Sequence, residues 1–186
     1  MELHYAIGDC TLGKLLVASN GNGVCAVLLG DDRDVLLSDL NRRFRSTDKQ
    51  ESSNRIALLL TQVADHIRHP GSNHPTVKLD PQGTPFQQQV WSALRQIPVG
   101  NTITYQALAE RIGAPRAVRA VAGACAANPI AVLIPCHRVL RSDGGLSGYR
   151  WGVERKRALL EAESTTSIKS PIFFAVVTES VSPKWP

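Results

Sequence analysis

The strongest restriction on the fold comes from two short helical segments joined by a tight turn in the C-terminal half. Thr104 is a good N-terminal cap for a helix that runs through Ile112, and residues 113–115 (Gly-Ala-Pro) then form the turn. Pro115 is expected to open the next helix, which continues to about Ala127. Two short helices joined by a glycine-containing turn are typical of a helix-turn-helix, a motif found in DNA-binding proteins.

Another helix is predicted just before this pair. Thr84 occupies the cap position, Pro85 the first helical position and Gln87 the third, which is the order that a capping box requires. Its apolar residues recur at helical spacing, and they are Phe86, Val90, Trp91, Leu94 and Ile97. The C-terminal half is therefore expected to be mainly helical.

The N-terminal half has the pattern of a small α+β domain. Residues 3–7, 14–18 and 24–29 are predicted strands, because each is apolar and is bounded by glycine or asparagine. Two amphipathic helices are predicted to follow. The first is capped at Asp31-Asp32 and has the apolar positions Val35, Leu36, Leu40 and Phe44; the second has Ile56, Leu59, Leu60, Val63 and Ile67 and ends before Pro70. Residues 46–53 are predicted to be a loop, and residues 77–79 a last strand.

Basic residues are concentrated in the C-terminal half. Residues 95–157 carry ten Lys or Arg and three Asp or Glu, whereas residues 1–94 carry nine and ten. Such a basic block suits a surface that faces phosphates, although a solvated basic face has the same composition. The helix after the turn starts with Arg116 and Arg119 and otherwise consists almost entirely of small residues, which favours close approach to a narrow minor groove.

Cysteine usage and hydropathy favour a cytoplasmic protein. The four cysteines are scattered and form no C-x-x-C, which argues against a disulfide scaffold and against a cysteine-rich zinc site. His66, His69 and His74 have no carboxylate or thiol at ligand spacing, so neither a metal nor another cofactor is expected. No apolar run is long enough for a membrane span, and the N-terminus lacks the pattern of a signal peptide, so no membrane partner is expected.

Cys136 is the candidate nucleophile. It is followed directly by His137 in the stretch Ile-Pro-Cys-His-Arg-Val at residues 134–139. The thiolate is the attacking form of cysteine, and a nearby base or positive charge favours it. The stretch is expected to be extended, so Cys136 and His137 would point to opposite sides and act together through a bridging water or a local kink. The alternative is a structural thiol, because most free cysteines are buried core residues.

A third group should orient the imidazole of His137. The predicted helix over residues 152–163 offers Glu154, Glu161 and Glu163, and the pattern does not choose among them.

Two further features lie beside the candidate nucleophile. Asn128 ends the small-residue helix, where a left-handed conformation is expected. The glycine-rich residues 144–152 form a loop of the kind that lines pockets. Tyr149 and Trp151 in this loop are either pocket residues or ordinary packing aromatics.

These motifs together resemble the O6-alkylguanine-DNA alkyltransferases. The resemblance rests on residues 134–139, Tyr105-Gln106, residues 116–121 (Arg-Ala-Val-Arg-Ala-Val) and Asn128-Pro129, and it covers about residues 1–163. Within the family, the chain is most similar to the methyltransferase half of the bacterial adaptive-response proteins. Those proteins also have an N-terminal zinc-bearing regulatory domain. This chain starts after that point and has no comparable cysteine cluster, so a regulatory role is not expected.

The resemblance implies an α+β/α fold. A small ribonuclease-H-like α/β domain at residues 1–80 would precede a helical catalytic and DNA-binding domain at residues 81–163, which contains a winged-helix-like helix-turn-helix. The tail at residues 164–186 has no family counterpart; its apolar run at 172–177 would add a strand, or the whole tail would be disordered.

The resemblance also implies DNA repair by direct reversal of damage. The substrate would be O6-alkylguanine, and also O4-alkylthymine, in double-stranded DNA that is bound through the minor groove. The damaged nucleotide would be flipped out, and its alkyl group transferred irreversibly to Cys136, once per molecule. Such a methylated-DNA–protein-cysteine S-methyltransferase would act as a monomer without a cofactor.

Roles for single residues follow from the resemblance. Cys136 would be the acceptor, His137 the water-linked base and Glu163 the last member of the relay. Asn128 would steady the turn before the site.

The resemblance assigns the remaining candidates to DNA binding and to the substrate pocket. Arg119 would fill the space left in the base stack, and Tyr105 would rotate a phosphate and protonate the leaving base. Gln106 and Ser142 would contact the DNA backbone, and Val139, Tyr149 and Arg150 would line the pocket.

Three other functions fit parts of the sequence. A non-catalytic damage sensor would use the same pocket, but family members without activity lack the cysteine that is present here at Cys136. A helix-turn-helix transcription factor with a merely buried Cys136 would bind a specific sequence and show no thiol reactivity. A Cys-His hydrolase is disfavoured, because nothing in the sequence indicates a peptide cleft or an oxyanion hole.

Overall fold

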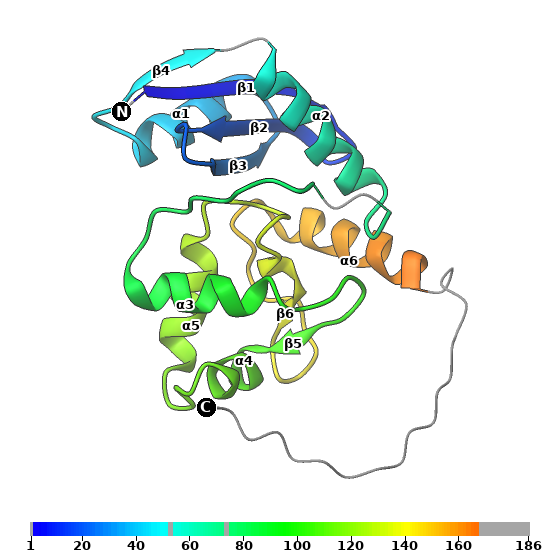
Figure 1. Ribbon diagram of the computed structural model, residues 1–186. Helices are drawn as coiled ribbons and strands as arrows, with labels where there is room; N and C mark the ends of the chain where they lie inside the picture. Colours follow the sequence, from blue (N-terminus) through cyan, green and yellow to red (C-terminus); the bar gives the residue numbers. More distant parts are fainter. Residues whose placement is uncertain (1, 52–53, 73–74, 168–186) are drawn as a thin grey trace.

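A four-stranded sheet forms the N-terminal part of the computed structural model, which describes residues 2–51, 54–72 and 75–167 (Figure 1). Strands β1 (Glu2–Cys10), β2 (Gly13–Ser19) and β3 (Val24–Gly30) are antiparallel neighbours, which confirms the three predicted strands. Strand β4 (Asp48–Glu51) pairs in parallel with β1, so the strand order is β3-β2-β1-β4.

Strand β4 shows that the predicted loop over residues 46–53 was wrong. Its sequence, Asp-Lys-Gln-Glu, is polar and mostly exposed, because the strand lies at the edge of the sheet. Its backbone pairing with the distant strand β1 holds it in place. Hydropathy does not distinguish such an edge strand from a loop, since no apolar alternation marks it.

Helices α1 (Arg33–Arg43) and α2 (Arg55–Arg68) pack on this sheet, α1 against β2 and β3 and α2 against β1 and β2. The predicted cap is confirmed, because the Asp32 carboxylate accepts a hydrogen bond from the Val35 backbone N–H at 2.8 Å. Leu36 and Leu40 are buried as predicted. The Val35 side chain is 55% exposed, so its predicted place on the buried face was wrong.

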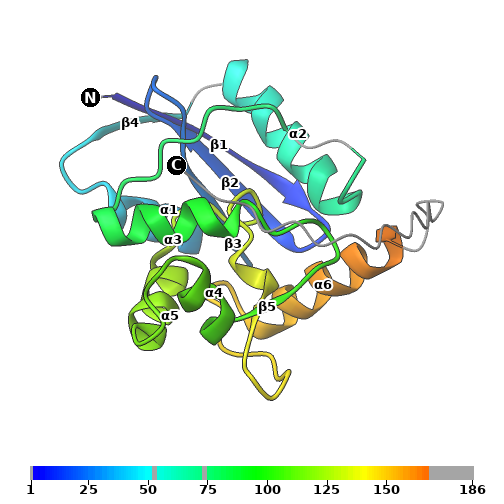
Figure 2. The ribbon, with the colours of Figure 1, turned by 60° about the horizontal axis from the view of Figure 1, so that its bottom comes forward.

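Helices dominate the C-terminal part (Figure 2). They are α3 (Pro85–Leu94), α4 (Tyr105–Arg111), α5 (Val118–Ala127) and α6 (Val153–Ser167). The short strands β5 (Ile103–Thr104) and β6 (Val139–Leu140) pair in parallel between them. The capping box of α3 and the Thr104 cap of α4 are confirmed by hydrogen bonds, Thr104 Oγ1 accepting from the Ala107 N–H at 3.1 Å.

The turn between α4 and α5 is longer than predicted. Helix α5 starts at Val118, so the expectation that Pro115 opens it was wrong. Gly113 has φ of 73°, which glycine adopts readily. The Ala117 N–H then donates to the Ala114 carbonyl at 2.8 Å and closes a separate turn before the helix begins.

The connection between the two parts lies along the outer edge of β3. The Val24 N–H donates to the Lys78 carbonyl and the Asp80 N–H donates to the Val24 carbonyl, both at 2.8 Å. Only a single bridge, between Val24 and Leu79, forms here, so the predicted strand at residues 77–79 was wrong.

The same edge of β3 also holds a segment close to Cys136. The Val27 N–H donates to the Pro129 carbonyl at 3.0 Å, and the Ala131 N–H donates to the Val27 carbonyl at 2.9 Å. The N-terminal sheet therefore fixes the backbone that leads into the candidate nucleophile.

No helix within the described ranges has the length and apolar content needed to cross a bilayer. His74 and the apolar run at residues 172–177 lie outside the described residues.

Candidate active site

Cys136 lies on a single 3₁₀ turn, Cys136–Arg138, between the β3-bound segment and β6. All three residues of the turn are buried, and the Cys136 residue is 5% exposed. The predicted extended conformation was therefore wrong over these three residues. A turn, unlike a strand, does not force the side chains of Cys136 and His137 to opposite sides, so it allows the two residues to act together either directly or through a water molecule.

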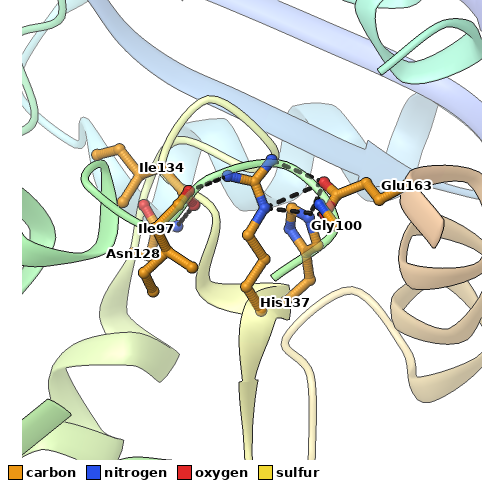
Figure 3. Close-up of polar contacts among 7 residues, drawn as sticks. Ile97, Gly100, Asn128, Ile134, His137 and Glu163 are labelled. Atoms are coloured by element: carbon orange, nitrogen blue, oxygen red, sulfur yellow. Dashed lines mark hydrogen bonds and ion pairs between the residues drawn. The ribbon is translucent and has the colours of Figure 1, made fainter. Parts of the chain in front are cut away.

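Asn128 holds the turn from the other side. Its Nδ2 donates to the Ile134 carbonyl at 2.8 Å and contacts Cys136 Sγ at 3.2 Å, while its Oδ1 accepts from the Ile130 N–H at 2.9 Å. Figure 3 shows Asn128 beside Ile134. Asn128 is fully buried, with φ of −49° and ψ of 121°, so the predicted left-handed conformation was wrong. Among the described non-glycine residues, the left-handed conformation is found instead at Val132, where φ is 66°.

Glu163 is the glutamate that meets His137. Its Oε1 lies 2.8 Å from His137 Nε2 (Figure 3). A carboxylate can only accept here, so Nε2 carries the hydrogen and Nδ1 is left as an acceptor. His137 Nδ1 is buried and has no hydrogen-bond partner among the described residues. The imidazole is thus in the tautomer that a general base requires.

Arg138 is a member of the site that sequence analysis missed. Its guanidinium donates to Glu163 Oε2 at 2.9 Å from Nε and to Oε1 at 2.8 Å from Nη2, and Nη1 donates to the Ile97 carbonyl. The Gly100 N–H donates to Glu163 Oε2 at 3.3 Å. These contacts fix the carboxylate in one orientation, as a bidentate arginine pair does.

The electrostatic environment keeps the thiol protonated in the protein without DNA. Burial raises the pKa of Cys136 to about 11, although the Asn128 hydrogen bond and the charge of Lys156 oppose this. Burial also lowers the pKa of His137, against the opposing effect of Glu163. The thiolate, which is the attacking form of cysteine, is therefore not the main form at rest, and the lowered pKa of His137 favours its neutral imidazole.

The environment of Glu163 favours the charged form of its side chain. Burial by itself would raise the pKa of this carboxyl group, but the hydrogen bonds from His137 and Arg138 outweigh burial and lower it to about 2. The relay therefore ends in a permanent negative charge at neutral pH.

Lys156 is a second residue that sequence analysis missed. It is fully buried on α6, and its Nζ donates to the Val139 carbonyl at 2.6 Å and to Ser147 Oγ at 3.2 Å. Lys156, Leu159 and Glu163 recur at helical spacing, and all three are buried. Two charged residues on the buried face of a helix are the signal in the sequence that marks this site.

Tyr149 and Tyr105 lie around the same centre. The Tyr149 ring packs edge-on against His137 at 6.5 Å between ring centroids and against Trp151 at 5.2 Å. Tyr149 Oη is buried without a hydrogen-bond partner among the described residues. Tyr105 Oη lies 2.7 Å from Ser147 Oγ.

Arg150 is engaged with the N-terminal part. Its Nη2 donates to Asp39 of α1 at 2.7 Å. Asp39 also pairs with Arg42 at 3.0 Å, and Arg43 of the same helix donates to the Asn128 carbonyl at 3.4 Å. The pKa of Asp39 is lowered, because the three arginines outweigh the effect of burial. Helix α1 thus contacts both the loop before α6 and the residue that holds Cys136.

The remaining predicted DNA contacts are on the surface. Arg119 on α5, Gln106 on α4 and Ser142 after β6 are exposed. Gln106 donates to Glu110 at 2.8 Å, and the structure gives no such hydrogen bond for the side chains of Arg119 and Ser142. These residues are not part of the buried centre; Gln106 is on α4, Arg119 is on α5 and Ser142 follows β6. Within the described ranges, no cluster of three His, Cys, Asp or Glu side chains could hold a metal ion.

The chain combines a sheet domain with a helical domain that contains a helix-turn-helix. Its buried centre holds a thiol in contact with Asn128 and a His137–Glu163 pair. These features define a class of DNA-binding proteins with a buried cysteine. A family model described as 6-O-methylguanine DNA methyltransferase, DNA binding domain, matches residues 85–165. The chain is 55% identical over 163 residues to the methylated-DNA–protein-cysteine methyltransferase of Mycobacterium tuberculosis H37Rv, covering 88% of this chain and 93% of that protein. The chain belongs to the methylated-DNA–protein-cysteine methyltransferase family, which confirms the predicted family.

Two other relatives support this membership. The chain is 50% identical over 164 residues to the bifunctional transcriptional activator/DNA repair enzyme Ada of Escherichia coli K12, and it spans 46% of the length of that protein. The crystal structure of the Mycobacterium tuberculosis OGT in complex with DNA superimposes with a TM-score of 0.72 at 35% identity, covering 88% of this chain and 94% of that chain. The solved relatives have, like this chain, an N-terminal sheet domain and a helical C-terminal domain.

Proposed function

We propose that this chain repairs double-stranded DNA by moving the alkyl group of O6-alkylguanine, and of O4-alkylthymine, irreversibly onto Cys136. The observation that carries the proposal is the buried arrangement in which Asn128 contacts Cys136 Sγ at 3.2 Å and Glu163 binds the neighbouring His137 at 2.8 Å. Membership of a family whose curated relatives are named methylated-DNA–protein-cysteine methyltransferases supports it.

The buried relay supplies the thiolate. His137 Nδ1 takes the proton of Cys136 through one water molecule, and Glu163 stabilises the imidazolium that forms. The pKa of about 11 leaves little thiolate at rest, so this proton transfer has to accompany the attack. Asn128 donates a hydrogen bond that favours the anionic sulfur.

The transfer is a displacement at the alkyl carbon. The Cys136 sulfur forms a bond to that carbon, the bond from the carbon to O6 breaks, and its electron pair stays on the base. Tyr105 gives its proton to the leaving base. A thioether has no good leaving group, so no step regenerates the thiol, and each molecule acts once.

The base has to leave the duplex before the attack. An alkyl group on O6 inside a base stack offers no path for in-line approach, and extrusion costs a few kcal/mol. Arg119 is exposed on α5 and fills the vacated space, while Gln106 and Ser142 contact the backbone through the minor groove. Val139, Tyr149 and Arg150 line the pocket for the extruded base, and the Tyr149 ring packs edge-on against His137.

The finer description of the fold belongs to the same proposal. We assign a ribonuclease-H-like domain to residues 1–80 and a winged-helix-like catalytic domain to residues 81–163, and leave the role of residues 164–186 open. The parallel addition of β4 to an antiparallel meander supports the first assignment, and the short parallel pair β5-β6 beside α4 supports the second. A monomer in the bacterial cytoplasm stays the predicted state.

A transcription factor with an inert cysteine is the competing function. A merely structural thiol would lie among hydrocarbon side chains, whereas Cys136 Sγ contacts an amide nitrogen and lies within the field of a buried lysine. These contacts favour the transferase.

The test is to incubate the protein with duplex DNA that contains O6-methylguanine and to measure the mass of the intact chain. We expect the gain of one methyl group, located on Cys136 by peptide mapping. Cys136→Ala should bind the same duplex and gain nothing, and Cys25→Ala, which removes another buried thiol, should still be methylated. Transfer that persists in Cys136→Ala contradicts the proposal.

A further inference from the structure

A buried lysine connects the reactive cysteine to Tyr105. Lys156 is fully buried, and its Nζ has two hydrogen-bond acceptors within the described residues, the Val139 carbonyl and Ser147 Oγ. No carboxylate of the described ranges pairs with it. An ammonium group buried without a carboxylate is costly, so a function is the expected reason for its presence.

Two thiols interact electrostatically with Lys156. Cys136 and Cys125 are the groups whose negative forms stabilise its charge, and burial opposes that charge. Lys156 in turn favours the thiolate of Cys136. The positive charge of Lys156 is therefore tied to the ionisation of the sulfur that reacts.

Ser147 extends this contact to the phenol. Its Oγ accepts from Lys156 Nζ at 3.2 Å and lies 2.7 Å from Tyr105 Oη. The three side chains come from α6, from the loop before it and from the start of α4, so the tertiary fold builds a continuous chain of exchangeable protons. A serine hydroxyl can donate to one neighbour while it accepts from the other.

We propose that Lys156 and Ser147 form a proton path that restores the hydroxyl of Tyr105 during alkyl transfer. The inference rests on the proposed function, in which Tyr105 protonates the departing base. As the phenol proton leaves, Ser147 gives its hydroxyl proton to the phenolate oxygen, and Lys156 gives an N–H proton to Ser147. The thiolate, the ammonium and the alkylated base thus become a thioether, a neutral amine and an unmodified base, and the charges balance.

The difference in proton affinity between the two ends of the path drives the last step. Burial raises the pKa of Tyr105 and lowers the pKa of Lys156. A phenolate that has given its proton to the base therefore takes one from the ammonium through Ser147. Ser147 and Lys156 act through Tyr105 and are positioning residues.

The experiment measures the single-turnover rate constant of methyl transfer at saturating protein. We expect Ser147→Ala to lower this rate constant about tenfold, at the lower end of general acid catalysis, with the affinity for methylated duplex unchanged. Ser147→Thr keeps the hydroxyl and should restore most of the rate. Ser164→Ala, which removes an exposed hydroxyl from α6, is the matched control and should behave as the wild type.

A double-mutant cycle separates a proton path from a packing effect. If the path operates, Ser147→Ala should cause no further loss in Tyr105→Phe, because the phenol that it serves is gone. Ser147→Gly replaces the alanine variant in the cycle if the latter does not fold. Lys156→Met should raise the pH at which Cys136 reacts with iodoacetamide, and Ser147→Ala should leave that profile unchanged.

Two results overturn the proton path. The first is a wild-type rate constant of methyl transfer in Ser147→Ala. The second is a Ser147→Ala substitution that lowers this rate constant by the same factor in Tyr105→Phe as in the wild type. A wild-type protein that gains no methyl group contradicts the proposed function instead, so the two failures are distinguishable.

Discussion

Glu163 joins three groups at one carboxylate, His137, Arg138 and the Gly100 N–H. Its pKa of about 2, against 4.5 in the unfolded chain, means that the ionised form stabilises the fold. This contribution is complete above the unfolded pKa and is lost as the pH falls through the folded one. A shift of this size corresponds to about 3 kcal/mol.

Glu163→Gln tests this contribution. We expect the variant to lose about 3 kcal/mol of unfolding free energy at neutral pH, since buried Arg138 is left without its carboxylate. Its stability should also depend less on pH from about pH 5 to about pH 3 than that of the wild type. Urea titrations across this range measure both effects. Glu161→Gln, which changes an exposed glutamate of the same helix, should match the wild type; equal pH profiles for Glu163→Gln and wild type contradict the assignment.

Prediction from sequence was uneven at the level of single residues. Cys136 and His137 stand out because they are adjacent in a short motif, and the resemblance to the family pointed to Glu163. Lys156 and Arg138 were missed, because the sequence does not show whether a Lys or Arg in a basic region is buried or exposed. Only the helical spacing of Lys156 to buried Leu159 and Glu163 distinguishes it.

At the level of elements, helix α1 is coupled to the loop before α6. The Asp39–Arg150 pair joins α1 to this loop, which also contains Tyr149 and Ser147. Cys136 is buried, so under the proposed function this neighbourhood has to open before a base can reach the sulfur. We expect the ion pair to restrain the loop against such an opening.

We expect Asp39→Asn to increase hydrogen exchange in residues 141–152. The pair is partly exposed, so its loss should lower the unfolding free energy by about 1 kcal/mol or less. Hydrogen–deuterium exchange with mass spectrometry measures the change. Glu51→Gln, which removes the exposed Arg33–Glu51 pair from the far strand, is the control and should leave the loop unchanged. Unaltered exchange of the loop in Asp39→Asn would show that the pair does not restrain it.

The backbone hydrogen bonds between the edge of β3 and residues 78–80, called the seam below, allow a second prediction. A Cβ at Gly23 would lie 2.6 Å from the Lys78 carbonyl oxygen, so Gly23→Ala should lower the unfolding free energy by about 1–3 kcal/mol. Gly123→Ala makes the same chemical change on exposed α5, with no atom within 4 Å, and should raise it by up to about 1 kcal/mol. Thermal or urea denaturation compares the two; equal stability of Gly23→Ala and wild type would contradict the close packing of this seam.

Elements with local signals were predicted well. The capping boxes and caps at Thr84, Thr104 and Asp32 define helix starts within a few residues, because the signal and the structure are in the same turn. Strand β4 and the bridge at Leu79 depend on partners far along the chain. Local hydropathy carries no information about such partners, and it therefore failed at both places.

At the level of the whole molecule, the net positive charge is concentrated in the helical C-terminal part and not in the N-terminal sheet part. Ten of the 21 Lys and Arg residues lie in residues 95–157, which contain α4, α5 and the turn of Cys136. The sheet part is nearly neutral. Phosphate contacts from one face should therefore dominate DNA binding and make it independent of sequence and sensitive to salt.

We expect the logarithm of the affinity for duplex DNA to fall linearly with the logarithm of salt concentration. Arg116→Ala removes an exposed charge before α5 and should reduce the slope by about 1. Arg45→Ala removes an exposed charge after α1 and should leave the slope unchanged. Fluorescence anisotropy at several salt concentrations measures both. A slope that changes equally in the two variants would contradict a one-sided binding surface.

The depth of the sulfur has a consequence for the lifetime of the protein in a cell. Burial raises the pKa of the Cys136 thiol, so the protonated form dominates at neutral pH. Diffusing oxidants and small electrophiles react with thiolates, so burial should slow their reaction with this sulfur. Under the proposed function, in which each molecule reacts once, burial would preserve the thiol until a lesion engages it.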